Sequence, residues 1–205
     1  KIPKLATETL RTLHGFPRVL AYLCAGSLTL ITFYSAFFGV FLPIIQRSLH
    51  ICLLLVIIFL WFPATRRSPR DRPSAVDYAL CAAALAILGW TIYSNHRFMT
   101  RIPFYGAMRA ADLYSGLAIT LMILEAGRRT LGMTIVVIAG IFIGYAFAGP
   151  WMPEIFAHTG MSLRRFVDIM YLTDMGVWGS LVGTSATLLF IFISYLLFNG
   201  KVYIF

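Results

Sequence analysis

The chain has 205 residues, of which 60% are hydrophobic and 12% are charged, and its net charge is +9. Its mean hydropathy is +0.82. A single soluble core of this length cannot shelter so large an apolar fraction from water. The composition therefore excludes an ordinary water-soluble domain and places the chain in a lipid bilayer.

Charge-free runs predict where the chain crosses the bilayer, because a spanning helix needs about 20 residues without an unpaired charge. They predict an all-α polytopic membrane protein with about six transmembrane helices. The predicted spans are Leu20–Val40, Ile44–Phe62, Val76–Tyr93, Gly106–Leu124, Leu131–Ala148 and Ser180–Phe198. The fourth has only 12 consecutive uncharged residues. It reaches spanning length if Arg109 and Asp112 pair or lie near the interface.

The amino end is basic and opens on Lys1 rather than on methionine. We therefore expect the sequence to be a fragment of a longer protein. A basic stretch followed by an apolar one is also typical of a signal peptide, but this apolar run is too long and no small-x-small cleavage site follows it. The first span is predicted to be retained.

Arginine-rich segments predict the orientation of the chain. The segment Pro63–Ser74 contains four arginines within seven residues and lies between two predicted spans. It lacks aromatic residues on which nucleic-acid bases would stack, so we interpret it as a cytoplasmic loop rather than as a nucleic-acid site. With both chain ends also inside, 11 of the 17 basic residues are cytoplasmic, in agreement with the positive-inside rule.

The junction between the fourth and fifth spans combines one carboxylate with two arginines. Glu125 precedes Arg128 and Arg129 by three and four residues, which is the favourable order for an ion pair on a helix. The alternative is a buried proton or cation site, because carboxylates within membranes are often functional. The position of Glu125 at a helix end, beside two arginines, favours the ion pair.

Small residues at four-residue spacing predict close helix packing in the last two spans. They are Gly140, Gly144 and Ala148 in the fifth span, and Gly179 and Gly183 at the start of the sixth. This spacing does not identify the partner helix.

An amphipathic helix is predicted over Ser162–Leu172, lying in the plane of the membrane interface. Ser162 is the expected N-cap. The apolar residues recur at helical spacing: Leu163, Phe166, Val167, Met170 and Tyr171. We expect Arg164, Arg165 and Asp168 on the wet side.

No pattern typical of catalysis or metal binding is present in the sequence. The histidines lie at span edges or in loops, so the facing pairs that a haem protein needs are missing. Cys24, Cys52 and Cys81 lie in three different spans without a CxxC motif, which predicts packing residues rather than a metal cluster or disulfides. Protease, hydrolase and phosphate-loop motifs are also missing. We therefore expect no catalytic residue, no metal site and no cofactor in this chain.

Three segments resemble a known family: FYSAFFG to QRSLHICLLLVIIFLWFPATRR (Phe33–Arg67), ILEAGRRTLG, and YAFAGPWMPEIFAHTGMSLRRFVDIMYLTDMGVWGSLVGTSATLLFIFISYLLF. They are similar to the fused permease of tripartite ATP-independent periplasmic (TRAP) transporters, in which small and large membrane subunits form one polypeptide. The resemblance covers Phe33–Phe198 and is most specific over Tyr145–Thr187. It implies a four-helix small-subunit-like domain over residues 1–126. Residues 127–205 then begin the large-subunit-like domain.

This resemblance implies secondary active transport of organic acids, typically carboxylates, across the bacterial inner membrane. A sodium gradient drives the transport, and a periplasmic binding protein delivers the substrate to a domain that moves like an elevator. Ion and substrate sites of such permeases lie in re-entrant hairpins and broken helices, which would follow the sixth span. Sodium ions are therefore expected in the remainder of the large permease domain.

We expect this chain to be the amino-terminal scaffold part of such a permease, with the Ser162–Leu172 helix bracing the moving part. The alternative is an accessory or assembly membrane subunit that does not itself transport. Six residues predicted outside are candidates for contacting the binding protein: Arg47, His50, Arg97, Arg101, Arg164 and Arg165. The simpler interpretation, which we favour, is that they anchor helix ends among lipid headgroups.

Overall fold

The computed structural model describes residues 11–39, 42–65, 68–69, 72–153 and 155–179. In these residues the structure is helical, with five helices long and apolar enough to cross a membrane. The chain is therefore an all-α, multi-pass membrane protein, as the hydropathy predicted. The sixth predicted span, Ser180–Phe198, lies outside the described residues.

The five long helices match the first five predicted spans closely. They are α2 (Phe16–Phe38), α3 (Pro43–Trp61), α4 (Ala75–Thr100), α5 (Ala110–Thr130) and α6 (Met133–Ala148). The largest differences are at the carboxyl ends of α4 and α5, which reach Thr100 and Thr130 instead of Tyr93 and Leu124. The polar residues after Tyr93 continue α4 instead of ending it, whereas Gly106 lies in the following loop rather than in the fourth span.

Contacts divide the chain into two compact units, of which the second is His96–Trp178 and the first is the rest of the chain. The predicted division between the small- and large-subunit-like domains at residues 126 and 127 stays a prediction. In the first unit α2 packs against α3, and the core residues of α3 include Cys52, Val56 and Phe59, none of them accessible to solvent. Cys81 of α4 places its Sγ 3.8 Å from the carbonyl oxygen of Val56.

A buried ion pair closes the loop between α3 and α4 in the first unit. The Nη1 of Arg11 lies 2.8 Å from the Oδ2 of Asp77, and both side chains are inaccessible to solvent. The same guanidinium donates to the carbonyl of Pro69 at 3.1 Å and to the hydroxyl of Ser68 at 3.1 Å. Arg11 therefore links the amino end of the first unit to the α3–α4 loop and to the start of α4.

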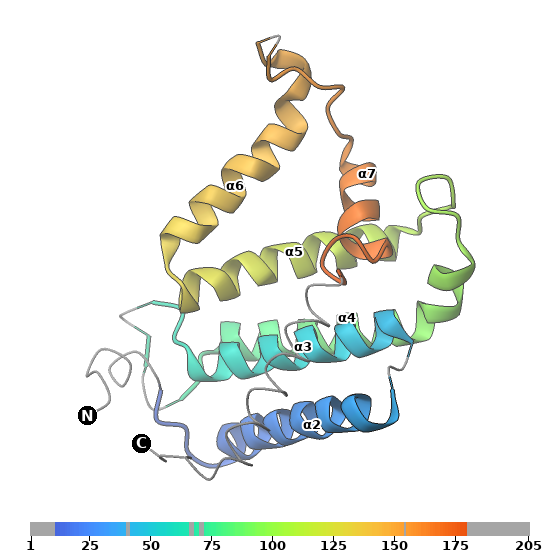
Figure 1. Ribbon diagram of the computed structural model, residues 1–205. Coiled ribbons are helices and arrows are strands. Elements are labelled where there is room, and N and C mark those ends of the chain that lie inside the picture. Colours follow the sequence, from blue (N-terminus) through green and yellow to red (C-terminus); the bar gives the residue numbers. More distant parts are fainter. Residues whose placement is uncertain (1–10, 40–41, 66–67, 70–71, 154, 180–205) are drawn as a thin grey trace, which may run out of the picture. The chain divides into compact units, whose positions relative to one another are not determined.

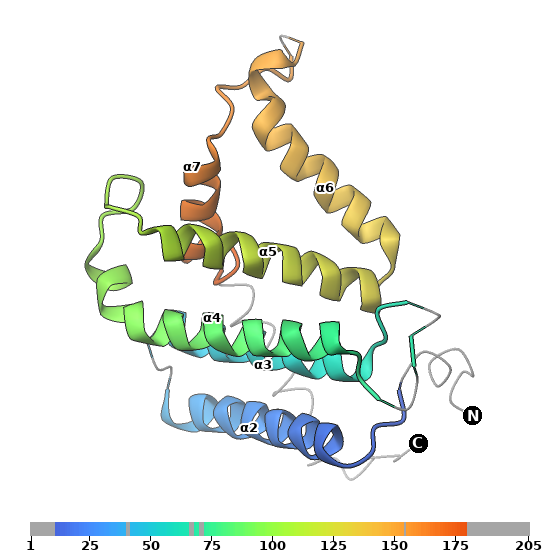
Figure 2. The ribbon, with the colours of Figure 1, turned by 180° about the vertical axis from the view of Figure 1, so that it is seen from behind.

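The second unit contains the end of α4, then α5, α6 and a short helical segment that we call the return segment (Leu163–Leu172). The return segment consists of α7 (Leu163–Val167) and one π-helical turn, η2 (Asp168–Leu172). Gly132, with φ of 93°, separates α5 from α6 in a backbone conformation that other residues rarely adopt. Both ribbon views show α6 leaving the end of α5 and α7 lying beside the start of α5 (Figures 1 and 2).

The turn after α6 is held together by His158. Its Nδ1 accepts a hydrogen bond from the backbone N–H of Gly160 at 3.1 Å, so its Nε2 carries the proton donated to the carbonyl of Tyr145 at 3.0 Å. A Cβ at Gly149 would lie 2.4 Å from the imidazole ring, which leaves room only for glycine. This histidine, expected at a span edge or in a loop, lies in the turn and holds it together.

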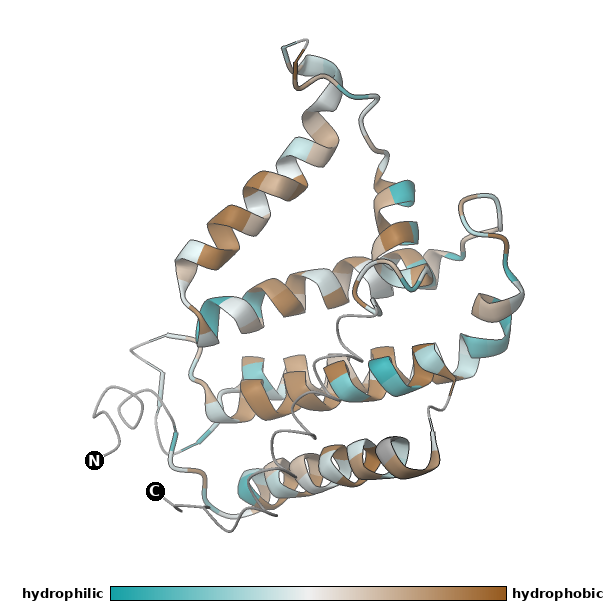
Figure 3. Ribbon diagram, in the orientation of Figure 1, coloured by the Kyte–Doolittle hydropathy of each residue, from teal (hydrophilic) through white to brown (hydrophobic). Residues whose placement is uncertain are grey.

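Hydropathy along the ribbon separates the helix bodies from their connections (Figure 3). Apolar residues dominate α3 and α6, whereas hydrophilic residues gather where α4 ends and on α7. In the described part of α6 no residue is buried. An apolar helix with so much exposed surface is stable only if lipid or another apolar partner covers it.

Candidate functional site

Among the residues that the structure describes, many charged side chains lie at the connection between α4 and α5 and on the return segment. Arg97, in the last turn of α4, donates two hydrogen bonds to Asp112 of α5, at 2.7 Å to Oδ2 and 2.6 Å to Oδ1. The Asp112 carboxylate also accepts the backbone N–H of Arg109 at 3.0 Å. Because this carboxylate is inaccessible to solvent, the three bonds replace its lost hydration and close the loop.

This arrangement corrects the partner that we had considered for Asp112. Its carboxylate pairs with Arg97 across the loop, and Arg109 contributes its backbone N–H rather than its guanidinium. The physical reason is geometric. Arg109 is the N-cap residue of α5 and Asp112 is its N3 residue, so the carboxylate turns back to the backbone N–H of Arg109, while Arg97 in the last turn of α4 binds both of its oxygens.

A second buried ion pair joins the same loop to the return segment. Arg101 Nη1 contacts Asp168 Oδ1, and Nη2 donates to Oδ2 at 3.1 Å. The side chains are only 6% and 5% exposed. Asp168 also accepts the backbone N–H of Phe104 at 3.0 Å, whose φ of 68° is in the left-handed region. The pair therefore holds a locally strained loop in place.

Asp168 is the clearest correction to the sequence prediction, which had placed it on the wet side of the helix beside Arg164 and Arg165. The residue is 3% exposed, whereas both arginines are exposed. The loop after α4 covers this part of the return segment, and Arg101 from that loop compensates the charge of Asp168. The N-cap prediction is confirmed, because the Ser162 hydroxyl accepts the backbone N–H of Arg165 at 3.3 Å.

Close packing against α5 explains why the return segment lies where it does. A Cβ at Gly116 would lie 2.5 Å from Cγ1 of Val167 and 2.9 Å from Cβ of Tyr171, so glycine permits the approach. Tyr171 is inaccessible to solvent, meets Phe98 edge-on at 5.8 Å, and accepts a hydrogen bond from Trp178 Nε1 at 2.7 Å. Protein thus covers most of the predicted apolar face of this helix.

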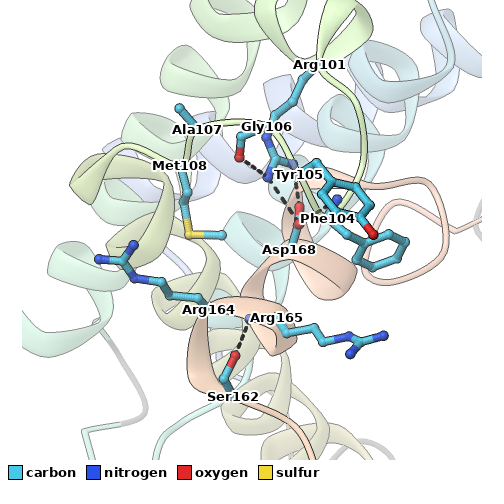
Figure 4. A pocket seen from close by; sticks show the side chains of 10 residues that line it. All are labelled: Arg101, Phe104, Tyr105, Gly106, Ala107, Met108, Ser162, Arg164, Arg165 and Asp168. Carbon is cyan, nitrogen blue, oxygen red and sulfur yellow. Dashed lines mark hydrogen bonds and ion pairs between the residues drawn. The ribbon is translucent and has the colours of Figure 1, made fainter.

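A polar cleft of about 480 Å³ lies between the loop and the return segment (Figure 4). Its walls are Arg101 and residues 104–108 on one side, and Ser162, Arg164, Arg165 and Asp168 on the other. The guanidinium of Arg165 lies 5.7 Å from the ring centre of Phe104. Three arginines and one carboxylate make the lining positive, so the cleft favours anions.

The predicted ion pair at the start of the α5–α6 junction forms in the structure. Glu125 accepts from Arg128 Nε and Nη2, both at 2.8 Å, and from Arg129 Nε at 2.7 Å. Glu125 is 28% exposed and Arg129 only 1% exposed. A carboxylate that accepts from two arginines is an anchoring group, and this geometry favours the ion pair over the proton or cation site that we had kept as an alternative.

The six residues predicted as binding-protein contacts or headgroup anchors do not form one group. Arg47 and His50 lie half-buried in the first turns of α3, in the first unit. The other four lie in the second unit, where Arg97 and Arg101 are bound to carboxylates of the chain itself. The exposed pair Arg164 and Arg165 therefore carries the accessible charge of this group in the second unit.

The residues of the small-residue ladders are only partly described. Gly140 and Gly144 lie on exposed parts of α6, and within the described structure no atom lies within 4 Å of a Cβ built at either position. Ala148 and Gly179 are half-buried, and Gly183 lies outside the described residues. Their role in helix packing stays a prediction.

Composition contains one signal that predicts ion pairs. The chain has only eight acidic residues, and an acidic residue close to membrane spans is expected to be paired. Four described carboxylates, Asp77, Asp112, Glu125 and Asp168, indeed pair with arginine. Only the Glu125 partners were predictable, because they are the only ones on the same helix.

The fold and these contacts define a multi-pass helical membrane protein braced by arginine–carboxylate pairs. Comparisons with known protein families, with curated proteins and with solved structures find no match to the chain. Among the described residues, no group of three histidine, cysteine, aspartate or glutamate side chains is arranged to hold a metal ion.

Proposed function

We propose that the chain is the amino-terminal scaffold part of a sodium-coupled permease for organic acids, typically carboxylates, that a periplasmic binding protein delivers. The observation that carries the proposal is the sequence block Tyr145–Thr187, which resembles the fused TRAP permease. Five long apolar helices and a short helix that returns to them are compatible with the immobile frame of such a transporter.

The way in which the return segment is fixed also supports a scaffold role. A bracing helix must transmit force without bending where it joins the rest of the domain. Two kinds of contact hold the return segment at this place. The buried Arg101–Asp168 pair ties it to the loop after α4, and the close contact at Gly116 seats it on α5. In this proposal sodium and substrate bind in the remainder of the large permease domain.

The first test is the intact mass of the native membrane protein, together with the downstream coding sequence read in all three frames. A native protein well above 23 kDa, with further apolar helices after Phe198, is the expected result. A native mass of about 23 kDa, with the chain bound to a separate large membrane subunit, would support the accessory subunit instead and refute the fused permease.

The second test is uptake of radiolabelled succinate, 2-oxoglutarate and pyruvate by cells that carry or lack the gene. Uptake of at least one carboxylate is expected to require the gene, an added sodium gradient and the periplasmic fraction. Replacing sodium by potassium at equal ionic strength is the control. Unchanged uptake after gene deletion, across a wider panel of organic acids as well, would refute the transport function.

The contact role of the residues on α3 is tested in the same assay with Arg47→Gln and His50→Gln. If these residues dock the binding protein, the variants lower its stimulation of uptake and leave the membrane yield unchanged. If they anchor the helix end among headgroups, the yield falls and the stimulation per molecule is preserved.

A further inference from the structure

The polar cleft carries more positive charge than its own carboxylate can balance. Asp168 is fully engaged by Arg101 and by the backbone N–H of Phe104, so it does not compensate Arg164 and Arg165. Both of these guanidiniums are exposed at the wall of the cleft, and Arg165 lies over the ring of Phe104. Figure 4 shows their guanidiniums pointing to opposite sides of the return segment, so each adds positive charge to the rim of the cleft at a different place. A phosphate group, which accepts several charge-assisted hydrogen bonds, suits such a lining.

An apolar groove of about 370 Å³ adjoins the cleft. It is lined mostly by carbon atoms of residues 97, 100–102 and 105–107, and it shares Arg101, Tyr105, Gly106 and Ala107 with the cleft. The two cavities therefore meet at one wall. A ligand that fits both has an anionic head and a hydrocarbon tail.

The shared wall contains a polar atom without a partner. Arg101 Nε is buried, and no acceptor among the described residues binds it. It lies against Gly106, where an added Cβ would come within 2.8 Å of it. A buried N–H without an acceptor is costly and rare in native structures, so an acceptor that reached it past Gly106 would remove this cost.

We propose that the cleft and the groove together bind one anionic phospholipid. Its phosphate lies in the cleft, to which Arg164 and Arg165 both contribute positive charge, and the start of one acyl chain follows the groove toward Ile102. The site lies at the end of the span α4, where a bilayer presents headgroups, and the neighbouring Tyr105 is 90% exposed, as is typical of aromatic residues at the membrane interface. The inference depends on the membrane character of the chain and not on its transport activity.

The test uses the purified full chain in dodecyl maltoside micelles. The midpoint of thermal unfolding is measured against added dioleoyl phosphatidylglycerol and, separately, dioleoyl phosphatidylcholine, which has the same acyl chains and no net charge. Phosphatidylglycerol is expected to raise the midpoint at lower mole fractions than phosphatidylcholine. Native mass spectrometry of the same samples should show one phosphatidylglycerol retained per chain.

Variants separate this site from general attraction between a basic protein and anionic lipid. The double variant R164Q/R165Q is expected to raise the half-saturating mole fraction of phosphatidylglycerol at least about tenfold, because two charge-assisted contacts are lost. The single variants R165Q and R18Q form a matched pair, since Arg18 is also exposed and lies 5.7 Å from an aromatic ring centre, that of Tyr22. R18Q is expected to leave the lipid response unchanged.

Three results would overturn the proposal. The first is an equal response to the two lipids. The second is an unchanged phosphatidylglycerol response in R164Q/R165Q, which would show that the lipid does not bind through these arginines. The third is equal protection by inorganic phosphate or by deacylated glycerophosphoglycerol, which would make the cleft a site for soluble anions.

Discussion

The Arg101–Asp168 pair allows the sharpest test of how this protein is held together. Asp168→Ala removes a carboxylate that accepts two hydrogen bonds from Arg101 and one from the Phe104 backbone. Both side chains are more than nine-tenths buried, so the arginine is left charged and unpaired in the interior. Breaking one side of a buried ion pair costs about 3–5 kcal/mol.

The expected size of the effect separates this pair from surface charges. For a chain of this length each kcal/mol lowers the unfolding midpoint by about 2–4 °C, so Asp168→Ala should lower it by about 10 °C. Arg164→Ala, one turn earlier and exposed, is the matched control and should change it by about 1 °C at most. The double variant Arg101→Met/Asp168→Leu should recover much of the loss, because no charge stays buried.

Trp178 provides the readout. Its side chain is inaccessible to solvent and its Nε1 donates to the carbonyl of Tyr171, so its fluorescence reports on the return segment when the other three tryptophans are replaced by phenylalanine. A midpoint for Asp168→Ala no lower than that of Arg164→Ala would refute the reasoning. The reasoning would also be refuted if Arg101→Met/Asp168→Leu lowered the unfolding midpoint by the sum of the decreases measured for Arg101→Met and Asp168→Leu separately.

Three further predictions follow from packing and burial. Gly116→Ala should lower stability by about 1–3 kcal/mol through overpacking, whereas Gly140→Ala should not, because the space around Gly140 is open; equal midpoints in thermal unfolding would contradict this. Asp112→Ala should cost about 3 kcal/mol and open the loop between α4 and α5 to limited proteolysis, so an unchanged cleavage rate would count against the bracing role. Cys52 has no accessible surface, so it should resist labelling by maleimide until the protein unfolds. A cysteine introduced by Tyr105→Cys, at an exposed position, should react at once. Fast labelling of Cys52 in the folded protein would contradict the burial of the α3 core.

Much of the fold follows from local sequence. Apolar length predicted the first five spans, with their ends placed to within about seven residues, because a run of some 20 apolar residues has few other stable solutions in a bilayer. The N-cap at Ser162 and the Glu125 pair with Arg128 and Arg129 were equally accessible, since all their contacts lie within four residues of one another. Periodicity suffices for such contacts.

The ion pairs between residues far apart in the chain could not be predicted from the sequence. Arg101 and Asp168 are 67 positions apart, and Arg11 and Asp77 are 66 apart. With 17 basic residues available to eight acidic ones, composition predicts that each buried acid finds a cation but does not select which one. The helical wheel placed Asp168 on the wet side because it takes no account of distant segments, whereas Arg101 and Phe104 of the loop after α4 bind this carboxylate.

The sequence by itself therefore determined the class of the protein, its helices and the anchoring pair at the end of α5. These properties depend on hydropathy and on contacts between near neighbours along the chain. Only the tertiary structure decided that Gly116 seats the return segment on α5, that Asp168 is buried against Arg101, and that Arg164 and Arg165 share a cleft. The physical reason is that these features arise where distant segments pack together, and side-chain shape and burial act there only after the chain has folded.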